Sequence, residues 1–219
     1  GSIPGAMGNA VVNDIIYVFG GWQSTTPSFD DRTWQYDPNA AAGSRWTMLS
    51  AVLSEPRSYI MTAVIGSKIY AMGGDNAYTG SDIIPSDVVE VLDVSAATPA
   101  WSALASMPVA TGEGQGFSAA YPGVAEYWQT HVMVAGGGDW PDQSAQCMVY
   151  DTANDVWNAG FPSLIEARRN HAGVFIPMCT ADPDDGLPGM WVFGGRTTSD
   201  DPPYGIPEFY PLECSPGGV

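Results

Sequence analysis

The stretch Ile15-Ile16-Tyr17-Val18-Phe19-Gly20-Gly21 sets the reading of this chain, because a β-branched and aromatic run ends there in two glycines. The same pattern returns three times within the 219 residues, at 68–74, 131–137 and 190–195. Runs of this composition are typical of strands, and a glycine pair is typical of the turn that ends one. The chain therefore contains a fourfold repeat of β-strand units.

Three further marks stay in step with the glycine pairs, whose first members are residues 20, 73, 136 and 194. A strand with a Tyr-Asp-like ending follows each pair; the endings are Tyr36-Asp37, Leu92-Asp93, Tyr150-Asp151 and Phe209-Tyr210. A tryptophan comes next in three of the copies, as Trp46, Trp101 and Trp157. A Pro or Arg opens the strand before the pair, as in Pro56-Arg57, Met107-Pro108 and Arg168-Arg169. Each unit thus predicts four short strands, a to d, with the glycine pair closing strand b.

Together these marks resemble the kelch repeat, and the resemblance covers nearly the whole chain. The second copy has Leu92 in place of the tyrosine, the third lacks the arginine, and the fourth lacks the tryptophan. The resemblance implies an all-β fold, a kelch-type β-propeller with four blades of mostly four antiparallel strands. We expect one domain over residues 3–219, with blades at about 4–49, 56–104, 112–160 and 168–219. Residues 1–2 are interpreted as the remnant of a cleaved tag.

The fourth copy predicts an incomplete blade. Its tryptophan would fall at about 217–220, and the sequence ends at Val219, so the last blade is expected to lack strand d. Three outcomes stay open: a ring that closes with a three-stranded blade, a piece of a larger propeller, or two chains that cover each other's exposed edges. A monomer and a homodimer are both compatible with this pattern.

Charge narrows the classes of partner. Seven basic residues stand against 24 acidic ones, so the formal net charge is −17. Such a chain repels phosphate backbones and anionic membrane surfaces, so we expect no nucleic-acid and no membrane partner. No run of 18 apolar residues or signal peptide is visible. Lys68 is the sole lysine, and the turns are rich in Asp and Asn, which favours an extracellular or cell-surface protein.

Catalytic and metal-binding motifs are scarce. The two histidines, His131 and His171, both fall on repeat positions, and the three cysteines form no CxxC pair. We therefore expect no cofactor, no metal and no enzymatic activity. Cys179 and Cys214 are candidates for a disulfide within the last blade, and their state stays open.

The candidate binding surface follows from strand order. In an a-to-d meander the b–c and d–a loops open at one rim, and the b–c loops here are long. Aromatic and arginine side chains gather in these loops, and aromatics on exposed loops are typical of recognition sites. The rim candidates are Trp22, Phe29, Arg57, Tyr78, Trp140, Arg168, Arg169, Arg196 and Tyr204. The arginines have a second interpretation, in which they pair with Asp and Glu and hold blades together.

These features favour a non-enzymatic recognition or scaffold module that binds a protein or small ligand, including a carbohydrate, through this rim. Two alternatives remain open. One is a sugar-directed kelch enzyme, either mutarotase-like or oxidase-like, since the kelch resemblance includes such enzymes. The other is a purely structural surface repeat.

Overall fold

The computed structural model describes residues 4–23, 28–80, 82–118, 130–139, 141–158, 161–176, 189–197 and 205–211. These residues contain strands, turns and loops and no helix, and hence no helix that would span a membrane. The strands form four main antiparallel sheets and three small two-stranded ribbons. We number the main sheets blade 1 to blade 4 in chain order.

Each blade follows the predicted a-to-d meander. Blade 1 consists of β1 (Gly8–Val12), β2 (Ile15–Phe19), β5 (Arg32–Tyr36) and β6 (Trp46–Val52). Blade 2 consists of β7 (Met61–Ile65), β8 (Lys68–Met72), β11 (Val89–Asp93) and β12 (Trp101–Ala103). Blade 3 consists of β13 (Gln115–Phe117), β14 (His131–Ala135), β17 (Cys147–Asp151) and β18 (Val156–Asn158). Among the described residues, blade 4 has three strands, β19 (Ala172–Ile176), β20 (Gly189–Phe193) and β21 (Glu208–Pro211). The predicted all-β fold of four antiparallel blades is confirmed, whereas residues 212–219, on which the expected absence of strand d depends, lie outside the described residues.

The blades stack one on the next through apolar side chains. Successive residues of a strand point to opposite faces of its sheet, so a strand buried on both sides must be apolar at every position. In β8, Ile69 and Ala71 pack toward blade 1, and Tyr70 and Met72 pack toward blade 3. We call these the trailing and leading faces of a blade, respectively. Each fully buried side chain of this kind stabilises the fold by about 1.5–3 kcal/mol, which explains the unbroken apolar runs in the sequence.

Glycine is required where strand b ends. Gly73 has a φ of +55°, which a residue with a side chain rarely adopts. A Cβ at this position would overlap the Thr111 carbonyl oxygen and the Met61 and Met107 side chains, which come from two blades. The first glycine of the pair therefore allows blades 2 and 3 to approach each other at their rim.

The strand that precedes the second glycine pair begins later than the sequence indicated. Pro56-Arg57 marks its predicted start, but β7 begins at Met61. Ser58 instead forms an isolated bridge to Asp75, and Tyr59 has a left-handed φ of 51°. The intervening residues make a tight loop at the rim, and that loop lines the candidate site.

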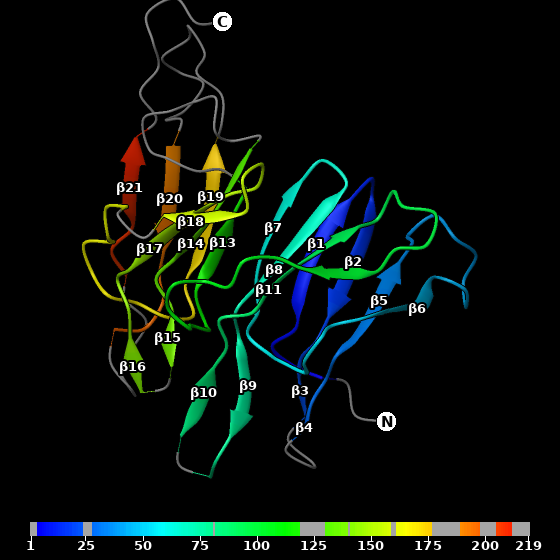
Figure 1. Cartoon of the computed structure of the whole chain (residues 1–219), viewed down its shortest axis with the longest axis horizontal. Helices are drawn as coiled ribbons and strands as arrows, with labels where there is room; N and C mark the ends of the chain where they lie inside the picture. Colours follow the sequence, from blue (N-terminus) through cyan, green and yellow to red (C-terminus); the bar gives the residue numbers. More distant parts are fainter. Residues whose placement is uncertain are drawn as a thin grey trace, which may run out of the picture.

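The stack has two ends. The innermost strands β1, β7, β13 and β19 pack against one another in that order. Figure 1 shows the four sheets side by side in chain order, with blade 1 and blade 4 at opposite ends. Within the described residues, the sheets therefore form an open row.

Candidate functional site

Three of the b–c connections fold as two-stranded ribbons that project from one rim, at the lower edge of Figure 1. They are β3 (Trp22–Gln23) with β4 (Ser28–Phe29), β9 (Asp75–Tyr78) with β10 (Ile83–Pro85), and β15 (Gly138–Asp139) with β16 (Asp142–Gln143). Each residue that follows a glycine pair also bridges to the loop before strand a of its own blade. These bridges are Gly5 with Trp22, Ser58 with Asp75, Gly112 with Gly138, and Arg169 with Arg196. Both sets of loops therefore lie at the same rim.

A pocket of about 300 Å³ lies between the first two ribbons. Trp22 and Phe29 are cross-strand partners on the first ribbon, and Tyr78 and Ile83 are partners on the second. Ser58, Tyr59 and Asp75 complete the lining from the bridge at the foot of the second ribbon. The structure thus brings together three of the predicted rim aromatics, the first and last of which, Trp22 and Tyr78, are 56 residues apart in the sequence. Nothing in the repeat pattern pointed to Tyr59 or Asp75.

Asp75 is the unusual polar group of this pocket. Its backbone N–H donates to the Ser58 carbonyl at 2.8 Å, which fixes the residue at the rim. Its side chain is buried, and neither carboxylate oxygen has a hydrogen-bond partner among the described residues. Burial, followed by the charges of Glu113 and Asp139, raises the pKa of Asp75 to about 8, although Arg169 partly offsets them. A carboxyl in this environment is protonated at neutral pH.

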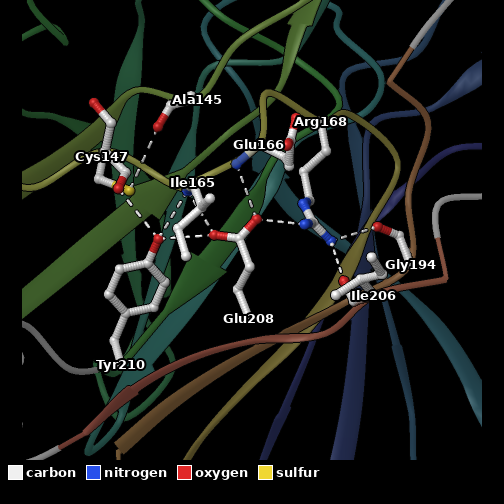
Figure 2. Close-up of polar contacts among 10 residues, drawn as sticks. Ala145, Cys147, Ile165, Glu166, Arg168, Gly194, Ile206, Glu208 and Tyr210 are labelled. Atoms are coloured by element: carbon white, nitrogen blue, oxygen red, sulfur yellow. Dashed lines mark hydrogen bonds and ion pairs between the residues drawn. The ribbon is translucent and has the colours of Figure 1, made fainter.

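Two of the predicted rim arginines lie inside the protein. Arg57 is fully buried and donates to the carbonyl oxygens of Gly73 at 2.7 Å and Val88 at 2.8 Å, and to Glu90 at 2.5 Å. Arg168 is also fully buried and is bonded in the same way to Gly194, Ile206 and Glu208 (Figure 2). Both make the structural ion pairs that were the second interpretation of the arginines. A ligand at the rim does not reach them.

The carboxylates of Glu90 and Glu208 also bind backbone N–H groups of the loop that precedes their own blade. Glu90 accepts a hydrogen bond from the Ser54 N–H at 2.9 Å, and Glu208 accepts one from the Glu166 N–H at 3.1 Å (Figure 2). Each Arg–Glu pair therefore fastens the loop between two blades to strand c of the later blade, and we call this arrangement the staple. Blades 2 and 4 contain it. Blade 3 has Thr111 and Met148 at the corresponding positions.

The remaining rim candidates differ in exposure. Arg169 is buried and bonded to Glu113 at 2.6 Å, which links the loops before blades 3 and 4. Arg196 is exposed beside its bridge to Arg169. Trp140 and Tyr204 lie outside the described residues, as do Cys179 and Cys214. Cys147 is a buried free thiol whose pKa burial raises to about 12, so it is unreactive. In the part of the chain that the structure describes, His, Cys, Asp and Glu side chains form no metal-binding group.

Removing one member of a staple should cost more stability than removing both. We expect Glu90→Met to lower the free energy of unfolding by about 3 kcal/mol, because Arg57 is left buried without its counter-charge. Arg57→Thr combined with Glu90→Met copies blade 3 and should recover most of that loss. Urea unfolding of the two variants and the parent chain tests this. A double variant no more stable than Glu90→Met contradicts the structural role of the staple.

The raised pKa of Asp75 predicts a pH-dependent stability. The folded protein keeps the Asp75 proton up to about pH 8, whereas the unfolded chain releases it near the ordinary value of 3.8. The folded state binds more protons between these values, so its stability falls as pH rises through this window. Asp75→Asn removes that loss and should stabilise the protein relative to wild type by about 2 kcal/mol at about pH 9, with a smaller gain at about pH 5.

The measurement is urea unfolding at both pH values. Asp14→Asn serves as the control, because Asp14 is an exposed turn residue. A stability difference between Asp75→Asn and wild type that does not change with pH contradicts the buried, protonated state of Asp75.

Comparisons with known proteins agree with this architecture. The family model described as "Kelch motif" matches residues 5–51 and 56–108. A solved structure described as "Structure of YjhT" aligns with a TM-score of 0.64 and 15% identity over 89% of this chain, and this likeness shows the fold alone. The chain spans 64% of the length of that protein. No curated protein sequence matches the present chain.

Proposed function

The chain belongs to the kelch-repeat family, and on that premise we propose that it is a non-enzymatic recognition module whose rim pocket binds one group of a partner. The observation that carries this proposal is the pocket between the first two ribbons, where Trp22, Phe29, Tyr59 and Tyr78 surround a space of about 300 Å³. These side chains lie on a rim loop and on ribbons, away from the sheets that form the core. Rigid aromatic side chains in an exposed hollow are the usual anchors of recognition surfaces.

The size and chemistry of the pocket limit what it binds. Its volume is at the small end of ligand pockets, which run from about 300 to 1,000 Å³. One amino-acid side chain or one sugar ring fills such a space, and both offer an apolar face to an aromatic wall. The net charge of −17 favours a neutral or basic partner, because an acidic one is repelled on approach.

Binding is tested with three small probes: indole for an aromatic side chain, methyl glucoside for a sugar and tetramethylammonium for a cation. We expect at least one of them to shift the NMR signal of the Trp22 indole N–H in a saturable way. Tyr78→Ala should weaken that binding about 10-fold or more, because it removes one wall of the pocket.

Ile84→Ala is the matched control for the ribbon. Ile84 follows Ile83 on β10, is 41% exposed and does not line the pocket, so its loss should leave binding unchanged. Equal effects of Tyr78→Ala and Ile84→Ala, or no perturbation of Trp22 by any probe, argue against a binding pocket.

A sugar-directed enzyme is the second candidate, and Asp75 is the observation that favours it. A carboxyl whose pKa is about 8 and which borders a pocket is suited to give and take protons near neutral pH. The two candidates differ in outcome. A module binds a sugar without changing it, whereas a mutarotase-like enzyme speeds the exchange of its anomers and loses that activity in Asp75→Asn. NMR of a reducing sugar with and without the protein distinguishes them.

A further inference from the structure

The two ends of the row of blades each present an apolar face that no described sheet covers. At the fourth residue before each glycine pair, on the trailing face, Ile69 and Val132 are 0% exposed, whereas Ile16 of blade 1 is 37% exposed. Val11, which pairs with Ile16 across the sheet, is 61% exposed. The trailing face of blade 1 therefore has the side chains of a blade interface without the neighbouring blade.

Blade 4 shows the same departure on its leading face. At the residue before each glycine pair, Phe19, Met72 and Ala135 are 0% exposed, whereas Phe193 is 42% exposed. The Phe193 ring lies parallel to Trp191, with ring centroids 5.8 Å apart, and Trp191 stacks in turn on Phe209 at 4.4 Å. The leading face of blade 4 thus ends in a row of aromatic rings, of which Phe193 and Trp191 stand at positions that are buried in the other three blades.

The tryptophan of strand d also differs between blade 1, at the end of the row, and the inner blades 2 and 3. Trp101 of blade 2 donates its indole N–H to Thr33 of blade 1 at 2.8 Å. Trp157 of blade 3 donates to the Ala105 carbonyl, which follows blade 2, at 2.8 Å. Trp46 of blade 1 occupies the corresponding position, is 56% exposed, and its indole N–H has no acceptor among the described residues.

Backbone hydrogen bonds at the rim also continue from blade to blade. The second glycine of each pair donates to the loop before the next blade: Gly21 to Arg57 at 2.8 Å, Gly74 to Thr111 at 3.0 Å, and Gly137 to Arg168 at 2.8 Å. The left-handed residue of each loop donates to its counterpart in the previous loop: Tyr59 to Ala6 at 2.7 Å, Glu113 to Tyr59 at 3.3 Å, and Asn170 to Glu113 at 2.7 Å. Every interface between consecutive blades therefore uses the same two bonds.

The two ends hold the unused halves of these bonds. At blade 4, the Gly195 N–H and the Asn170 carbonyl have no backbone partner in the described part of the chain. At blade 1, the Pro4 carbonyl and the Ala6 N–H are likewise left over among the described residues. By analogy with the interfaces within the chain, the Gly195 N–H is the donor that matches the Pro4 carbonyl, and the Ala6 N–H is the donor that matches the Asn170 carbonyl. The two ends match each other in hydrogen bonding as well as in apolar character.

We propose that blade 4 of one copy of this chain packs on blade 1 of a second copy, as blade 3 packs on blade 4 within the chain. A second copy is the occupant because its blade 1 carries the complementary set of apolar residues and backbone groups. The apolar positions named above include no charged residue, so two chains of net charge −17 can meet there without direct repulsion between these side chains. Two copies joined at both ends make a ring of eight blades, which lies within the known range of propellers of about 4–8 blades.

Light scattering coupled to size exclusion gives the first test. We expect a species of twice the chain mass of 23.1 kDa. Ile16→Asp on blade 1 and Phe193→Asp on blade 4 should each shift the protein to the single-chain mass, because each puts a charge into both copies of the interface. Val156→Asp is the control, since Val156 is a 55% exposed residue of blade 3 and its replacement should leave the double mass unchanged. Circular dichroism shows whether each variant folds.

Mixing the two end variants tests the direction of packing. Phe193→Asp keeps an intact blade 1 face, and Ile16→Asp keeps an intact blade 4 face, so the mixture regains one intact interface and should recover a species of double mass. A dimer that survives Ile16→Asp but not Phe193→Asp means that like faces pair, which overturns the proposal. A folded wild-type chain of single mass at every concentration also overturns it.

Discussion

Each of the four blades carries apolar side chains on both faces of its sheet, and a sheet of that kind is stable in water when each face is covered. This constraint accounts for most of the fold. It explains why strand b is an unbroken apolar run, why the sheets stack in chain order, and why glycines close each strand where neighbouring blades approach. It also distinguishes blades 1 and 4 from blades 2 and 3. Each of the two end sheets has one apolar face that no described blade covers.

Stacking also builds the candidate site. The pocket is formed by ribbons of two neighbouring blades, so its walls exist because blade 1 packs on blade 2. The staple supports the same place from inside: Arg57 immediately precedes Ser58 and Tyr59, which line the pocket, and Glu90 holds Arg57 against blade 2. A buried ion pair is costly to break, so it fixes the loop in one arrangement. The aromatic side chains at the rim therefore rest on a rigid support.

Most of the fold could be predicted from the repeat pattern. The glycine pairs marked the end of every strand b, and the four copies of the repeat correspond to the four main sheets. Strand order alone placed Trp22, Phe29 and Tyr78 at one rim, where the structure joins them in a pocket. The binding role of these residues remains a prediction.

Other parts of the site were beyond sequence reasoning. Arg57 is an arginine at a loop position, and its burial depends on Glu90, 33 residues later, which no local pattern connects to it. Pairing each loop arginine with a glutamate in the following strand c would have been the one available signal, because Glu90 stands two residues before Leu92 and Glu208 two residues before Tyr210, at corresponding positions of the two blades that contain the staple. Asp75 and Tyr59 were missed because their surroundings come from loops of several blades.

Hydrogen–deuterium exchange at decreasing protein concentration tests the central constraint most directly. Coverage on both faces predicts slow exchange in β8 and β14 at every concentration, because blades 2 and 3 are enclosed by their own chain. It predicts that exchange in β2 and β20 is slow in concentrated protein and accelerates on dilution, as the end faces lose their neighbour. Exchange in β2 and β20 that matches β8 and does not change with dilution would contradict the claim that each sheet needs a neighbour on both faces.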